Sequence, residues 1–263
     1  MRSTRILTHL AAAVALLPVL SSFHGTPEGK ATRAFKLSKF AHDVTVHVVL
    51  HEMGHALVRE FDLPILGNEE TLADAFATHY LTRHMPERAV DVLVARTESL
   101  MSEARKVARD EWSVRGEHNS DARRAYQIAA LAVAAGSDGY RRVAEVVGMT
   151  EEEMRSARDY GSEIHRSWRR VLAPHRMPDG ERSTETRFAF DGDDELEREV
   201  RKRGLQDELR DALDRFDWHS QVTIRFEGGE GGAAWSRSRR TITVHREYVD
   251  RFVAQGKALA KRR

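Results

Sequence analysis

Two histidines four residues apart enclose a glutamate in the segment His51-Glu52-Met53-Gly54-His55. Residues i and i+4 share a face of a helix, so both imidazoles can bind one divalent ion. A zinc ion held in this way lowers the pKa of its water, and the adjacent Glu52 can accept the proton as that water attacks a carbonyl. The segment predicts one Zn²⁺ and peptide-bond hydrolysis with Glu52 as general base. The alternative is an ordinary amphipathic helix whose histidines face solvent or a partner carboxylate.

A third zinc ligand is expected from the segment that follows. Glu70 and Asp74 are four residues apart in a second predicted helix, so their carboxylates point the same way. We expect Glu70 to bind the metal and Asp74 to accept the second ring N–H of a ligating histidine, His51, which would fix its tautomer. Glu69 and Asp74 are alternative ligands. The competing interpretation is that Glu69 and Glu70 only favour the helix N-terminus through its dipole.

Helices must position these side chains, and the first half of the chain has their pattern. Apolar residues recur at helical intervals over about 40–59, and Asp62-Leu63-Pro64 ends that helix because proline cannot continue it. A second helix is predicted over about 69–83. A capping box of Thr150 and Glu153 opens a long helix that ends before Pro174. A mainly helical region is therefore predicted over 23–175.

The pattern changes after residue 175. Turn formers and charges over 176–192 predict a linker, because that stretch offers no apolar period. The region 193–263 should pack on the helical part as an amphipathic helix, with Gly204 a weak point within it, followed by a β-hairpin. The hairpin would pair 221–226 with 241–245, two segments that alternate with period two. The fold class predicted is α+β, mainly α, with a small C-terminal hairpin or sheet.

Composition and charge exclude several classes of function. The 263 residues include 42 basic and 41 acidic residues, which gives a net charge of +1. The chain therefore has no large excess of positive charge that would favour binding to nucleic acid. The absence of cysteine excludes disulfides and thiolate ligands. Arg2 and Arg5 precede an apolar run over 10–20, which predicts an export signal over 1–22 and a secreted or extracytoplasmic protein. An uncleaved N-terminal anchor stays open, and no other segment approaches the length of a membrane span. The oligomeric state is open.

The order of these motifs resembles the gluzincin branch of zinc metallopeptidases, to which thermolysin belongs. More narrowly, the chain resembles a bacterial metallopeptidase family whose activity is largely uncharacterised. The resemblance covers about residues 40–175 and is carried by the zinc helix, by 63–74 (Leu-Pro-Ile-Leu-Gly-Asn-Glu-Glu-Thr-Leu-Ala-Asp) and by 117–126 (Glu-His-Asn-Ser-Asp-Ala-Arg-Arg-Ala-Tyr). It implies a zincin-like helical core with His51, His55 and Glu70 as metal ligands.

The resemblance also suggests two further elements of the site. His118 would donate to the oxyanion that develops on the attacked carbonyl, although it could equally belong to a structural polar cluster with Asp121 and Arg124 at a helix start. Gluzincins bind substrate along an edge strand, and Gly232-Ala233-Ala234-Trp235 is the comparable segment here. That segment follows the zinc helix instead of preceding it, as in thermolysin, and lacks the family's asparagine. The alternative is a hairpin that only completes the core.

The leading hypothesis is a zinc metallopeptidase that acts on a peptide or protein substrate. A catalytically inactive zinc-binding protein that presents its groove to a peptide or protein partner is the alternative. An open coordination position facing a cleft favours the enzyme, and a closed site of four protein ligands favours the binding protein. A metal-free helical protein is the third possibility.

Overall fold

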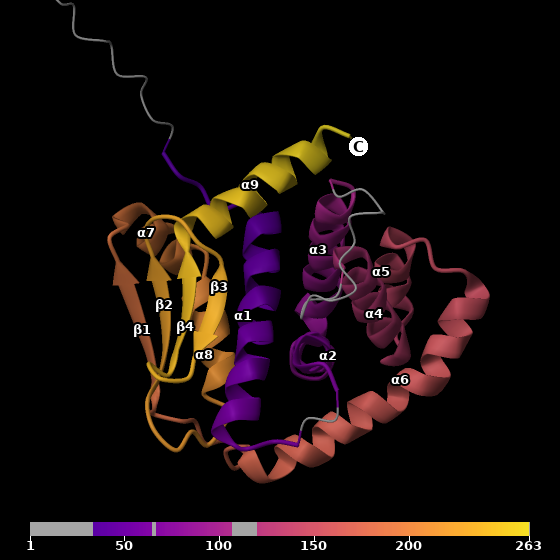
Figure 1. The fold of residues 1–263 in the computed structure, drawn as a ribbon, viewed down its shortest axis with the longest axis horizontal. Coiled ribbons are helices and arrows are strands. Elements are labelled where there is room, and N and C mark those ends of the chain that lie inside the picture. Colours follow the sequence, from indigo (N-terminus) through magenta and orange to yellow (C-terminus); the bar gives the residue numbers. More distant parts are fainter. Residues whose placement is uncertain (1–33, 65–66, 107–119, 263) are drawn as a thin grey trace, which may run out of the picture. The chain divides into compact units, whose positions relative to one another are not determined.

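Helix α1 (Lys39–Glu60) lies between the β-sheet and the other helices of the N-terminal half (Figure 1). The structure is a computed structural model that describes residues 34–64, 67–106 and 120–262. Seventeen of the 22 residues of α1 are buried, which suits a helix covered on opposite sides. Ser38 caps its first turn by accepting from the backbone N–H of Ala41. The predicted export segment 1–22 and His118 lie outside the described residues.

The helices of the predicted helical region lie on one side of α1 (Figure 1). They are α2 (Glu69–His84), α3 (Pro86–Ala104), α4 (Asp121–Ala134), α5 (Arg141–Val146) and α6 (Glu151–Leu172), with short 3-10 turns at Asp138–Tyr140 and Ala173–His175. Of these, α2 and α3 pack directly against α1. The capping box of Thr150 and Glu153 begins α6 as predicted. Within the described residues no helix is both long enough and apolar enough to cross a membrane.

A close approach between α1 and α2 determines where the predicted ligands lie. A Cβ on Gly54 would stand 3.0 Å from the Cα of Ala73, so only glycine allows the two helices to cross at this distance. Gly54 lies between the two histidines of α1, and Ala73 precedes Asp74 on α2. Asn68 begins α2 by accepting from the N–H of Thr71. The crossing therefore brings the acidic face of α2 to the histidines.

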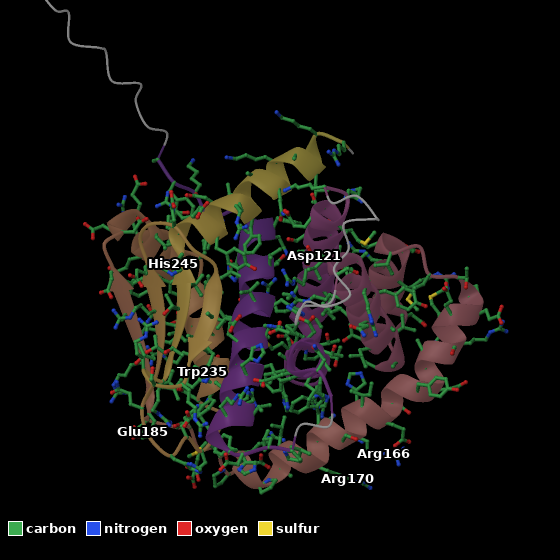
Figure 2. The ribbon with its side chains drawn as sticks, in the orientation of Figure 1. Asp121, Arg166, Arg170, Glu185, Trp235 and His245 are labelled. Atoms are coloured by element: carbon green, nitrogen blue, oxygen red, sulfur yellow. The ribbon has the colours of Figure 1, made fainter. Side chains whose placement is uncertain are left out.

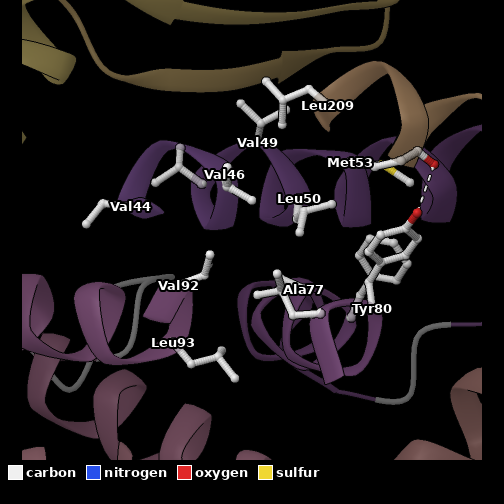
Figure 3. Packing of buried hydrophobic residues seen from close by; sticks show 14 of the residues in the cluster. Val44, Val46, Val49, Leu50, Met53, Ala77, Tyr80, Val92, Leu93 and Leu209 are labelled. Atoms are coloured by element: carbon white, nitrogen blue, oxygen red, sulfur yellow. Dashed lines mark hydrogen bonds between the residues drawn. The ribbon is translucent and has the colours of Figure 1, made fainter. Parts of the chain in front are cut away.

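The interior of this region is formed by aliphatic side chains from α1 together with residues of α2, α3 and α8 (Leu205–Leu213). Figure 3 shows Leu50 and Met53 of α1, with Ala77 and Tyr80 of α2 below them and Leu209 of α8 above. All five are buried. The Tyr80 hydroxyl donates to the carbonyl of Ala212, 3.4 Å away, so the α2 helix is tied to the C-terminal part. Truncating Leu50 or Met53 would cost about 2–5 kcal/mol.

The C-terminal part is a four-stranded sheet with helices α7 (Asp194–Lys202), α8 and α9 (Arg246–Ala260). The strands are β1 (Thr186–Asp191), β2 (Val222–Glu227), β3 (Ala233–Ser236) and β4 (Thr241–His245), in the order β1-β2-β4-β3. β1, β2 and β4 are parallel, with Ile224 aligned between Phe188 and Ile242, and β3 is antiparallel to β4. Edge strand β3 contacts α1.

The α+β, mainly α fold class is confirmed, but three details of the C-terminal part differ from prediction. The predicted hairpin of 221–226 with 241–245 is wrong, because β2 and β4 pair in parallel and β3 takes the antiparallel position beside β4. Residues 186–191 of the predicted linker form strand β1. The single predicted amphipathic helix is two helices, since Gly204 adopts φ 71°, a left-handed conformation that ends α7 and precedes α8.

Candidate metal centre and cleft

His51, His55 and Glu70 come together where α1 crosses α2. The Nε2 atoms of the two histidines are 3.2 Å apart. The carboxylate of Glu70 lies against both, with Oε2 3.3 Å from His51 Nε2 and Oε1 3.3 Å from His55 Nε2. Of the described residues, these three form the group whose donor atoms lie within 4.8 Å of one another and could hold a metal ion. The structure thus brings together all three predicted ligands.

The spacing of the three donors fits a zinc ion. Zinc bonds of about 2.0–2.1 Å in tetrahedral directions place neighbouring ligand atoms roughly 3.3 Å apart. The two Nε2 atoms are 3.2 Å apart, and each lies 3.3 Å from a different oxygen of Glu70, distances that are close to this edge length. Two imidazoles and one carboxylate are also the ligand types that zinc binds in catalytic sites, where a fourth position is left for solvent or substrate. The residues present therefore fit a single zinc ion.

The second nitrogen of each histidine is held by a carboxylate. His51 Nδ1 is 2.8 Å from Asp74 Oδ1, and His55 Nδ1 is 2.9 Å from Glu69 Oε1. Because an ionised carboxylate only accepts, each Nδ1 carries a proton and donates it, so Nε2 is the atom that each histidine can offer to a metal ion once any proton on Nε2 has left. The structure places Asp74 at the predicted position. Glu69, an alternative ligand in the sequence, lies beside Nδ1 of His55 and not beside Nε2.

Arginines hold both of these carboxylates. Arg124 of α4 donates to Asp74 from Nε at 2.7 Å and from Nη2 at 2.9 Å. Arg59 donates to Glu69 from Nη2 at 2.5 Å. Asp74 and Arg124 have side-chain exposures of only 3% and 12%, so this pair is shielded from solvent. The two carboxylates are thereby fixed before any metal binds, and they fix the imidazoles in turn.

The carboxylates around His51 and His55 make the binding of a further positive charge favourable. Burial lowers the pKa of His55, but hydrogen bonds to Glu70 and Glu69 outweigh it and raise that pKa to about 9. The pKa of His51 is raised by Asp74 and Glu70, against the opposing effect of burial. Burial raises the pKa of Glu70, yet the two histidines bring it far below its usual range. The site thus attracts either protons or a divalent cation.

Glu52 lies next to His51 and is held by the edge strand. Its Oε2 accepts from the backbone N–H of Trp235 at 2.8 Å, across 183 residues of sequence. Figure 2 shows Trp235 where β3 meets α1. The contact engages one carboxylate oxygen with a backbone group whose position depends on β3, so the carboxylate is oriented by the sheet. The segment Gly232-Ala233-Ala234-Trp235 therefore lies at the site and does more than complete the core.

A cavity of about 820 Å³ opens over the cluster. It is lined by the two histidines and Glu70, by Ala233, Ala234 and Trp235 of β3, and by Arg96 of α3 and Arg124 of α4. Asn68, Arg59, Glu69, Glu52, Val48, Arg237 and Tyr248 complete the lining. A volume of this size accommodates several residues of a peptide.

No motif of the sequence predicted Arg96, Arg59, Arg237 or Tyr248 as residues of this cavity. A signal for Arg96 existed, because it stands among Val92, Leu93 and Leu100 on the buried face of α3, where a charge is unexpected. Arg124 was considered only within a structural cluster with His118, and its observed partner is Asp74. His118 itself belongs to 107–119, outside the described residues. Asp121 begins α4 (Figure 2).

Residues 21–172 match the model of a protein family described as "Putative metallopeptidase", more than half of the chain. No curated protein and no solved structure matches the chain. The matched segment includes α1 and α2 with all the predicted metal ligands, and it ends at the last residue of α6.

Proposed function

Because the chain belongs to this metallopeptidase family, we propose that it is a zinc-dependent peptidase of the gluzincin type. Membership of the family implies a metal and peptide substrates. The proposal of zinc rests chiefly on one observation, the convergence of His51, His55 and Glu70 with one donor atom of each within 4.8 Å of the others. A bound zinc ion would supply a Lewis acid for the carbonyl and lower the pKa of water.

Glu52 is the general base in this proposal. It takes a proton from the attacking water and returns it to the amide nitrogen that leaves, so the two products are a carboxylate and an amine. The N–H of Trp235 holds one of its oxygens, which leaves the other for the water. Asp74 and Glu69 keep the Nδ1 protons of the two histidines in place, so that neither imidazole turns during the reaction.

Strand β3 is the expected docking edge for an extended peptide. Backbone groups of an antiparallel strand point alternately to its two sides. Gly232 accepts from His245 of β4, and Trp235 donates away from β4 to Glu52. By this alternation the backbone of Ala233 also faces away from β4, toward the cavity. A substrate backbone could pair there while its scissile carbonyl approaches the metal ligands.

The binding-protein alternative receives less support. A structural zinc site is closed by four protein ligands, whereas the described residues bring three donors together beside a large cavity. We also propose, from the sequence alone, that residues 1–22 direct export. Those residues lie outside the part of the chain that the structure describes.

The proposal is tested with a metal-replete assay against a broad peptide library. Glu52→Gln should lower kcat by about 10²–10⁴-fold, since the amide cannot accept the proton, with zinc content staying near one per chain. The matched control is Glu87→Gln, the same substitution at an exposed position of α3. It should leave turnover unchanged. Full activity in Glu52→Gln would refute the assigned mechanism.

A further inference from the structure

Arg96 is a buried cation in the wall of the cavity. It stands in the middle of α3 with only 5% of its surface exposed, and it lines the cavity that contains the metal ligands. The neighbouring apolar residues on its face of α3, Val92, Leu93 and Leu100, are all buried. The helix thus carries one long cationic side chain on the face that packs inward.

Arg96 has no carboxylate partner among the described residues. Its Nε is buried without a hydrogen bond, and no described acidic residue forms an ion pair with it. Arg124, which lines the same cavity, differs because it is paired with Asp74. The glutamates of the cavity are also engaged, Glu69 by Arg59 and Glu52 by the backbone of Trp235.

An unpaired buried charge is unfavourable, and arginine cannot relieve it by losing its proton. Burial lowers the pKa of Arg96 and the charge of Arg124 adds to this effect, while Asp74 and Asp121 act in the opposite direction without forming an ion pair with it. A guanidinium stays protonated in proteins. The fully buried His47 on α1 cannot neutralise this charge, because an imidazole is either neutral or cationic. A charge kept in such a place is typical of a binding site whose counter-ion arrives with the ligand.

We propose that Arg96 is a carboxylate-binding subsite, and that the substrates are peptides that place a carboxylate in the cavity beside the zinc ligands. The planar guanidinium offers two parallel N–H donors that match a carboxylate, and a buried pair of this kind is strong because it is shielded from solvent. The carboxylate can be the C-terminus of the peptide or an Asp or Glu side chain. This inference rests on the proposed peptidase function.

The test measures binding, so that it does not depend on turnover. Zinc-loaded, full-length Glu52→Gln protein is titrated by calorimetry with pairs of acetylated hexapeptides. One pair differs by a free or amidated C-terminus, and a second, amidated pair differs by Glu or Gln at each internal position. We expect the carboxylate form of at least one pair to bind about ten- to a hundredfold more tightly. The pair that shows the preference identifies the source of the carboxylate.

Variants at Arg96 connect this preference to one side chain. Adding Arg96→Gln to the Glu52→Gln protein should abolish the preference for the carboxylate form, while the amidated peptide binds as before. Arg96→Lys keeps the charge but loses the two parallel N–H donors of the guanidinium, so it should retain a reduced preference for the carboxylate form. This variant replaces Arg96→Gln in the test if Arg96→Gln does not fold. Arg142→Gln makes the same change of charge at an exposed position of α5 and should leave the binding of every peptide unchanged. Zinc content and melting temperature establish that each variant is folded.

Two results would overturn the subsite. One is equal binding, or no binding, of both members of every pair. The other is a loss in Arg96→Gln that is the same for acidic and amidated peptides, which would mean a structural role. The outcomes also separate the two proposals. A carboxylate preference in a protein that hydrolyses no peptide would leave the subsite standing and refute the peptidase, whereas hydrolysis without any preference would do the reverse.

Discussion

Asp74 makes the sharpest test of how the proposed zinc ligands are held. Its carboxylate accepts from His51 Nδ1 at 2.8 Å and from Arg124 at 2.7 and 2.9 Å. Asp74→Asn keeps the shape and one acceptor oxygen but removes the negative charge. The substitution therefore isolates the contribution of charge to metal affinity and to stability.

Two magnitudes follow from this geometry. Asp74 and Arg124 have charge centres roughly 4 Å apart, and at an effective dielectric constant of about 20 their attraction is about 4 kcal/mol. Removing one charge of a shielded pair typically costs about 3–5 kcal/mol. We expect the free energy of unfolding of the metal-free protein to fall by about 3 kcal/mol. Loss of the carboxylate behind a zinc-binding histidine typically weakens metal binding by about 10–100-fold.

Urea unfolding measures the first effect, and competition with a chromogenic chelator measures the second. Asp159→Asn, at an exposed position of α6, is the control and should change neither quantity. An unchanged zinc affinity combined with lower stability would refute the reasoning, because Asp74 would then be only the counter-ion of Arg124. Partial unfolding of the variant could by itself lower the apparent zinc affinity. The chelator competition is therefore carried out without urea, where both proteins are folded.

Two further predictions concern the scaffold around the site. Gly54→Ala places a Cβ 3.0 Å from the Cα of Ala73, so α2 must shift. We expect about 1–3 kcal/mol lower stability in urea and weaker zinc binding in the chelator assay, and unchanged values would contradict the close crossing. His79, buried and close to the rings of His165 and His84, has its pKa lowered to about 3, first by burial and then by these neighbours. The unfolded chain takes up this proton near pH 6.5, so stability falls as pH drops below 6.5 toward 3. Between pH 7 and 5, His79 should lower the free energy of unfolding by about 2 kcal/mol, so the free energy of unfolding of His79→Asn should fall by about 2 kcal/mol less than that of the wild type. An equal fall in both proteins would refute the role of His79.

Local spacing was enough to predict that His51, His55 and Glu70 come together, but not the whole cavity. The i, i+4 rule places His51 and His55 together, and the short connection from α1 to α2 makes the approach of Glu70 the simplest geometry. Arg96 and Trp235 could not be placed in this way, because nothing local relates them to α1. Trp235 is 183 residues from Glu52, and its contact depends on the docking of the sheet.

The relative direction of the two predicted strands could not be predicted from the sequence either. A period-two pattern shows that 221–226 and 241–245 are strands, but it is the same for parallel and antiparallel neighbours. The short strand β3 between them has no clear period-two pattern of its own and follows a run of glycines, so only the resemblance to gluzincins suggested a strand there. Strand β1 was missed because its edge position leaves most of it only half-buried, without a clear apolar alternation. At Gly204 the weak point was recognised, and the left-handed backbone makes it a complete break.

The contact between Glu52 and strand β3 links the start of the chain to its end. A nascent polypeptide that has been translated as far as α6 already contains His51, His55 and Glu70, the proposed zinc ligands, yet it lacks the backbone amide that orients the proposed base. Hydrolytic competence would then emerge only late in biosynthesis, once the sheet has docked against the central helix. Such timing would keep the proposed peptidase from acting while it is still being made.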